Sequence, residues 1–231
     1  DLSIQVHPDD EYAKIHEDGS LGKTECWYIL DCDPGTEIVI GHHAGSHEEM
    51  EAMIRGHQWD AFIRRVPVKK GDFFQINPGC VHAIKGGTLI LETQQSSDIT
   101  YRVYDYDRLS DGKPRQLHVE QSIATIEAPF QEASCDTFTE KIPGAVHTHL
   151  ITCPFYSVDK YEIDGVFTRE FSRYFANVSV ISGKGCVNGI PLETGQHFIV
   201  PAGAGELRFE GKMTVICSNP ETETRQNAAD L

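Results

Sequence analysis

Short hydrophobic segments separated by glycine and proline turns follow one another along most of this 231-residue chain. Clear examples of such turns are Lys70-Gly71, Asn77-Pro78-Gly79 and Lys85-Gly86-Gly87. The segments between them have the length of strands and are rich in β-branched and aromatic residues. This pattern predicts a mainly β chain, built as a barrel or a sandwich, in which a helix is an insertion.

The predicted strands fall into two halves. In the first half they are residues 2–7, 24–30, 37–40, 66–68, 73–76, 81–84, 88–93 and 100–106. In the second half they are residues 150–152, 155–161, 175–181, 197–200, 207–209 and 214–217. Between the halves, Asp111-Gly112-Lys113-Pro114 has the composition of a turn. We place a domain boundary there, with one domain over residues 1–112 and another over residues 113–231.

Two helices interrupt the strand pattern. Ser46-x-x-Glu49 has the form of a capping box, in which the hydroxyl and the carboxylate satisfy free amides of the first turn. Gly56 marks an end, so the sequence predicts a helical insertion near residues 46–57. A shorter helix is predicted over about residues 118–126, where it would link the two halves.

Composition excludes several classes of partner. The formal charge of −15 repels phosphate backbones and excludes a nucleic-acid partner. The seven cysteines are scattered and include no C-x-x-C pair, which indicates reduced intracellular thiols. No apolar run approaches the roughly 20 residues that span a bilayer, and no signal peptide is visible. We expect a cytoplasmic protein without a membrane partner.

Gln5 and His7 are the first candidates for chemistry. They lie two residues apart in a predicted strand, so their side chains share one face, while Ile4 and Val6 suit the opposite, packed face. A lone histidine in a strand is more often structural than a ligand. An amide and an imidazole on the same concave face, however, could contribute to a divalent-metal site.

Two further segments could complete that site. Lys23 and Glu25 share a face of the next strand, and His82 follows the tight turn at residues 77–79. Two imidazoles and one carboxylate suit Zn²⁺ and would also suit Fe²⁺ or Mn²⁺. Lys23 is either a lysine whose head reaches water or a cation that lines a pocket beside the metal.

Arg102 is flanked by Tyr101 and Val103, which belong inside a fold. Two interpretations remain open for it. One is a buried ion pair, and the candidate partners are Asp98, Asp105 and Glu92. The other is a fork of donors that stabilises an anion.

The remaining histidines rank below this set. His42, His43, His47 and His57 lie in the predicted helix and its entry loop, where solvated histidines are common. His147-x-His149 has the spacing of a metal pair on a strand, but no partner carboxylate is obvious.

The two halves share a faint repeat. A turn, a hydrophobic strand and a Pro/Gly turn occur over residues 71–82 and again over residues 195–206. The first copy ends at His82 and the second at Glu206. The repeat predicts two related barrels, of which only the first kept a metal site, although a coincidence of common turn residues would produce the same alignment.

Four segments carry a family resemblance. Residues 2–10, 22–28, 77–83 and 97–105 are similar to the signatures of type I mannose-6-phosphate isomerase, in its short Firmicutes-like bacterial form. The resemblance implies two cupin (jelly-roll) barrels with a small helical insertion, the first barrel catalytic. That family carries further strands before the Gln-x-His motif, and these N-terminal strands are missing here, so we expect that upstream residues exist.

The resemblance also implies roles for individual residues. His7, Glu25 and His82 would bind one Zn²⁺ per subunit, with Gln5 as a fourth ligand. Arg102 would be the active-site arginine. Lys23 and Asp98 would help in proton transfer or substrate binding.

The implied reaction is the interconversion of mannose 6-phosphate and fructose 6-phosphate through an enediol. Asp98, Lys23 and a zinc-bound water remain open as the base, and Arg102, Lys23 and Lys85 as phosphate contacts. The alternatives are an iron-dependent cupin dioxygenase and a non-catalytic cupin that binds sugar phosphates around a structural zinc. We expect a monomer or a homodimer of an enzyme of carbohydrate metabolism.

Overall fold

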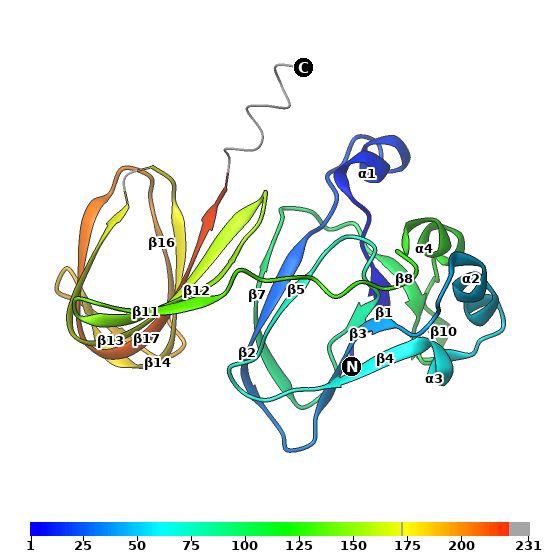
Figure 1. The fold of residues 1–231 in the computed structure, drawn as a ribbon, viewed down its shortest axis with the longest axis horizontal. Helices are drawn as coiled ribbons and strands as arrows, with labels where there is room; N and C mark the ends of the chain where they lie inside the picture. Colours follow the sequence, from blue (N-terminus) through cyan, green and yellow to red (C-terminus); the bar gives the residue numbers. More distant parts are fainter. Residues whose placement is uncertain (172, 222–231) are drawn as a thin grey trace. The chain divides into compact units, whose positions relative to one another are not determined.

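The computed structural model describes residues 1–171 and 173–221 and is mainly β, with 49% strand and 12% helix (Figure 1). The polar composition of the tail after Pro220 also predicts a frayed end, and this segment lies outside the described residues except for Glu221. Backbone contacts divide the chain into two compact units, Asp1–Ser134 and Cys135–Leu231. Within the described ranges, no helix is long and apolar enough to cross a membrane.

The first unit contains two main antiparallel sheets. The larger has the strand order β4-β3-β6-β1-β8 and the smaller has the order β5-β2-β7. Their bounds are β1 (Ile4–Val6), β2 (Glu25–Cys32), β3 (Glu37–His42), β4 (Ile63–Pro67), β5 (Phe73–Ile76), β6 (His82–Ala83), β7 (Thr88–Gln94) and β8 (Tyr101–Tyr104). A separate short pair joins β9 (Leu109–Ser110) to β10 (Lys113–Pro114).

Helices cover one face of the larger sheet. In Figure 1, α2 (His47–Arg55), α3 (Trp59–Phe62) and α4 (Val119–Thr125) gather beside β4 and β8, while α1 (Asp10–His16) follows β1. Ile4 and Val6 are fully buried in the apolar cluster that these helices share with the sheet. The opposite face of the sheet meets β2 and β5 through a second cluster that includes Trp27, Ile38 and Ile76. The predicted burial of Ile4 and Val6 is confirmed, which turns Gln5 and His7 toward the space between the sheets.

The predicted helical insertion is confirmed as α2. The hydroxyl of Ser46 accepts from the N–H of Glu49 at 3.2 Å, and the Glu49 carboxylate accepts from the N–H of Gly45 at 2.7 Å. Met50 and Ile54 point into the core from the other side of the helix. The capping residues therefore start the helix and its apolar stripe attaches it to the sheet.

The predicted linker helix lies inside the first unit. Ser122 and Ile123 of α4 are buried, and the N–H of His118 donates to the carbonyl of Arg102 at 2.8 Å. The unit boundary accordingly falls after residue 134, whereas the turn at residues 111–114 predicted it near residue 112. The turn at residues 111–114 predicted the earlier boundary because the sequence does not show that α4, which follows it, packs back onto β8.

The second unit is built on one sheet with the strand order β11-β12-β13-β17-β14-β15, and β16 also pairs with β14. The bounds are β11 (Phe138–Ile142), β12 (Ala145–Thr152), β13 (Tyr156–Phe171), β14 (Ala176–Val187), β15 (Ile190–Glu193), β16 (His197–Val200) and β17 (Gly205–Pro220). β13 and β17 contain 16 residues each, much longer than predicted, because glycine and exposed charged residues interrupt their apolar pattern. The description of either unit as a closed barrel remains a prediction.

Gly144, in the turn between β11 and β12, provides a test of this packing. It has a φ of +80°, and a Cβ atom there would lie 1.7 Å from the carbonyl oxygen of Val166. We expect Gly144→Ala to lower the free energy of unfolding by about 3 kcal/mol, from the left-handed backbone and the displacement of β13. The midpoint of urea unfolding measures this loss.

Gly189 supplies the matched control. It has a φ of +78°, but a Cβ atom there would meet nothing within 4 Å. Gly189→Ala should therefore cost only the backbone strain, about 1 kcal/mol. Equal losses for the two variants would show that close packing against β13 is not what requires Gly144.

Candidate metal centre

His7, Glu25 and His82 converge between the sheets of the first unit. Nε2 of His7 lies 3.4 Å from Oε2 of Glu25, and Nε2 of His82 lies 3.3 Å from Oε1 of the same carboxylate. The two imidazole centroids are 4.7 Å apart. All three side chains are almost completely buried. The structure thus brings together the three residues that the sequence motifs selected.

Strand pairing explains the convergence. In the larger sheet, Gln5 of β1 pairs with His82 of β6, and His7 follows just past the end of β1 on the same face. Glu25 begins β2 in the smaller sheet, where it pairs with Ile76. The two imidazoles therefore approach from one sheet and the carboxylate from the other.

The outer nitrogen of each imidazole is already engaged. Nδ1 of His7 lies 2.9 Å from the carbonyl oxygen of Ile99, and Nδ1 of His82 lies 2.9 Å from that of Cys80. A carbonyl only accepts, so Nδ1 carries the proton in both rings. In the neutral ring this leaves Nε2, the nitrogen that faces Glu25, with a lone pair, as metal-binding histidines require.

The electrostatics favour the same state. Burial raises the pKa of the Glu25 carboxyl, but contact with His7 and attraction by His82 and Lys23 outweigh burial and hold it well below its usual range. Burial lowers the pKa of His82 to about 4, against the opposing effect of Glu25. At neutral pH the site therefore presents an ionised carboxylate and a neutral His82.

These residues fit a metal ion. Nε2 of His7 and Oε1 of Glu25 have no hydrogen-bond partner among the described residues, although both are buried. Unpaired buried polar atoms are rare because each loses its bonds to water. A divalent cation between the three side chains would engage these atoms, and two imidazoles with a carboxylate form a known ligand set for zinc.

Gln5 and Lys23 border the centre. Nε2 of Gln5 donates to Nε2 of His82 at 3.2 Å, so the amide oxygen would have to turn inward to act as a ligand. Nζ of Lys23 lies 2.9 Å from Oε2 of Glu25 and 3.9 Å from Oε1 of Glu92. Lys23 is thus a largely buried cation that is held against a candidate metal ligand.

Arg102 lies in the same row of the larger sheet as Gln5 and His82. It pairs with Gln5 on the side opposite to His82, which places its Cα roughly 10 Å from that of His82, or two strand spacings. Directly paired residues project from the same face, so Arg102 shares the face of the candidate ligands. Its Nη1 donates to the carbonyl of Gln116 at 2.7 Å, whereas its buried Nε has no partner in the described residues.

The alternative role predicted for Arg102 is a buried ion pair with a neighbouring carboxylate. Asp105, one of its possible ion-pair partners, is bound by Arg108 and Arg115, and these hydrogen bonds lower the pKa of Asp105 to about 2. Across the described ranges, no ion pair joins Arg102 to Asp105, Asp98 or Glu92. Asp98 is exposed, and it precedes Ile99, the residue whose carbonyl orients His7.

His42, His147 and His149 differ from their sequence-based interpretation. His42 is buried rather than solvated: its Nε2 lies 2.9 Å from the carbonyl oxygen of Glu127 and its ring stacks on Phe62. His147 and His149 do have a partner carboxylate, Asp159. The sequence did not reveal it, because the register that places His149 opposite Asp159 depends on the pairing of β12 with β13.

An antiparallel β fold whose inner face carries a buried His–Glu–His group defines a candidate metal-binding protein of the cupin class. A family profile for the mannose-6-phosphate isomerase cupin domain matches residues 146–220. Mannose-6-phosphate isomerase ManA of Bacillus subtilis is 47% identical over 224 residues, which are 95% of this chain and 71% of that protein. The chain belongs to the mannose-6-phosphate isomerase family.

Further relatives agree with this assignment. A mannose-6-phosphate isomerase of Streptococcus mutans is 44% identical over 94% of this chain and 70% of its own length. The crystal structure of the mannose 6-phosphate isomerase from Bacillus subtilis superimposes with a TM-score of 0.90 at 42% identity, over 94% of this chain and 70% of that one. A putative mannosephosphate isomerase from Archaeoglobus fulgidus, at 16% identity over 96% of this chain and 68% of that one, shares the fold with a TM-score of 0.71.

Proposed function

We propose that this protein is a zinc-dependent aldose–ketose isomerase that interconverts mannose 6-phosphate and fructose 6-phosphate. Family membership supports the reaction, and the convergence of His7, Glu25 and His82 is the observation that carries the metal dependence. A cytoplasmic location and a monomeric or homodimeric state remain predictions.

His7, Glu25 and His82 would hold the zinc ion, and Gln5 would join them if its amide turned inward. When bound, the ion would supply Lewis-acid stabilisation for the negative charge that develops on O1 and O2 of the enediol. The same ligand set would accept iron or manganese, so the choice of zinc rests on the resemblance to the family.

Arg102 would stabilise the developing negative charge with fixed donors. Its place in the row of His82 and Gln5, and its unpaired Nε, support this role. A guanidinium cannot lose its proton in a protein, so it would act by charge and hydrogen bonding alone.

Proton transfer between C1 and C2 needs a group that accepts and returns a proton. Lys23 and Asp98 are the candidates in this chain. Lys23 is held by Glu25, and Asp98 adjoins the residue that orients His7. Arg102, Lys23 and Lys85 are the candidate cations for the phosphate group.

A coupled assay with mannose 6-phosphate, with and without a chelator, tests the proposal. We expect turnover in untreated protein, a loss of at least about 10²-fold after metal removal, and recovery on addition of Zn²⁺. The assay is run under nitrogen, because a dioxygenase would need oxygen and an isomerase would not. Binding of mannose 6-phosphate without turnover would instead indicate the non-catalytic alternative.

A further inference from the structure

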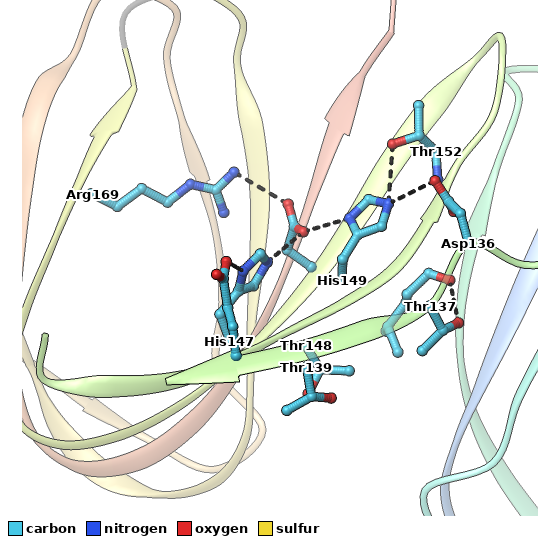
Figure 2. Close-up of polar contacts among 11 residues, drawn as sticks. Asp136, Thr137, Thr139, His147, Thr148, His149, Thr152 and Arg169 are labelled. Carbon is cyan, nitrogen blue, oxygen red and sulfur yellow. Dashed lines mark hydrogen bonds and ion pairs between the residues drawn. The ribbon is translucent and has the colours of Figure 1, made fainter. Parts of the chain in front are cut away.

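The second unit contains another cluster of ring nitrogens around a carboxylate (Figure 2). Nε2 of His147 lies 2.8 Å from Oδ1 of Asp159, and Nδ1 of His149 lies 2.9 Å from the same oxygen. The exposed fractions of the His147, His149 and Asp159 side chains are 14%, 12% and 12%. Two imidazoles and one carboxylate oxygen thus meet at a shielded point.

The β-ladder sets this arrangement. His147 and His149 are two residues apart on β12, so their rings project from the same face. His149 pairs with Asp159 of β13, and His147 pairs with Tyr161, which belongs to the apolar core of the unit. The cluster therefore lies on the inner face of the sheet, and paired strands position it rather than loops.

Both ring nitrogens of His147 face carboxylate oxygens. Its Nδ1 lies 3.0 Å from Oε1 of Glu140, while its Nε2 faces Oδ1 of Asp159. A neutral imidazole has a single N–H, and an ionised carboxylate only accepts hydrogen bonds. A neutral His147 therefore directs one lone pair at a carboxylate oxygen, a contact that a cation at the shared point would remove.

A cation bound by Nε2 of His147, Nδ1 of His149 and Oδ1 of Asp159 would leave each ligand with an outer hydrogen-bonding or charged partner. Metal-binding imidazoles usually donate their second N–H to an oxygen atom, which fixes the ring and its tautomer. Nδ1 of His147 lies 3.0 Å from Glu140. Nε2 of His149 lies 3.2 Å from Thr152 and 3.4 Å from Asp136. Oδ2 of Asp159 lies 3.5 Å from Arg169.

Aromatic rings hold these groups in place. His147 stacks on Tyr161 with centroids 4.8 Å apart, and His149 stacks on Phe138 at 5.2 Å. The Arg169 guanidinium lies 5.0 Å from the Tyr161 centroid and meets the outer oxygen of Asp159, Oδ2. Arg169 meets Oδ2 whereas both imidazoles meet Oδ1, so its charge orients the carboxylate and does not occupy the shared point; in Figure 2 it approaches from the side opposite to His149.

We infer that the second unit binds a divalent transition-metal ion of the zinc class through His147, His149 and Asp159. Two nitrogen ligands and one carboxylate oxygen suit this class, and Glu140 and Asp136 add negative charge that attracts a cation. The ion joins β12 to β13 and stabilises the second unit. This site departs from the sequence-based expectation that only the first domain kept a metal.

Zinc binding by the full chain tests the inference. Protein stripped with a chelator is dialysed against Zn²⁺, and bound metal is measured by elemental analysis. We expect His149→Ala and Asp159→Asn each to bind one zinc ion fewer per chain than the unmodified protein, with isomerase activity retained. His197→Ala is the matched control, because His197 also belongs to the second unit and bonds only Ser179 in the contacts described; it should bind as much zinc as the unmodified chain.

Cobalt separates this site from the one in the first unit. In a His82→Ala background, Co²⁺ should still give the visible absorption of a protein-bound ion, and adding His149→Ala should abolish it. Glu140→Gln, which keeps all three ligands, should weaken this binding by about 10-fold or more. Equal zinc content in the unmodified protein and in folded Asp159→Asn would overturn the inference and leave a network held by protons alone.

Discussion

His82→Ala is expected to lower kcat for mannose 6-phosphate by about 10³-fold or more and to remove the zinc of the first unit. His82 supplies one of the two imidazole nitrogens of a buried site, and its pKa of about 4 keeps that nitrogen available at neutral pH. Without it, a two-residue ligand set would hold the ion poorly. Steady-state kinetics and elemental analysis of the same preparation measure both effects.

His43→Ala is the control for this variant. His43 is exposed on the loop before α2 and lies outside the His7–Glu25–His82 group, so activity and zinc content should not change. His82→Gln tests the same ligand with less loss of volume, and near-ultraviolet circular dichroism shows whether either variant folds. Unchanged zinc occupancy of the first unit in folded His82→Ala would exclude His82 as a ligand.

Arg102→Ala is expected to lower kcat by about 10³-fold while zinc stays bound, because the variant removes a fixed positive charge and leaves the candidate ligands intact. KM should rise less than kcat falls if Arg102 acts on the charge that develops during the reaction. Arg102→Lys should recover only part of the rate, since an ammonium lacks the planar fork of donors. Kinetics at saturating substrate, with metal analysis, measure these differences.

Arg65→Ala controls for the loss of an arginine from the same sheet. Arg65 lies on β4 and forms a 2.8 Å ion pair with Asp60 at the surface, so its removal should change kcat little. A near-normal kcat in Arg102→Ala would refute the catalytic role. A loss of zinc and of thermal stability in that variant would instead make Arg102 a structural residue, bound through the carbonyl of Gln116.

Much of the first unit could be predicted from local pattern. The alternation of Ile4 and Val6 with Gln5 and His7 was enough to predict which face is buried, because successive side chains in a strand point to opposite sides. Strands such as β5 and the cap of α2 at Ser46 follow directly from turn and capping residues. The set of candidate metal ligands was predicted from motifs rather than from spacing, and the structure shows that the three side chains meet.

The second unit was harder to predict. β11 was missed because it is an edge strand and most of its residues are exposed, so it lacks an apolar alternation. The ends of β13 and β17 depend on their pairing with each other along their whole length, which compensates for interruptions such as Gly165 and Gly211. The carboxylate partner of His149 was likewise hidden in the register of β12 with β13.

The sequence by itself determined the β class, the insertion at α2, the faces of the first strands and the family, because these properties depend on neighbouring residues and on short motifs. Only the tertiary structure decided that α4 belongs to the first unit and that His147, His149 and Asp159 share one point. The physical reason is that both depend on contacts between distant segments, which the hydrogen-bond register and the packing of side chains select and which no local pattern records.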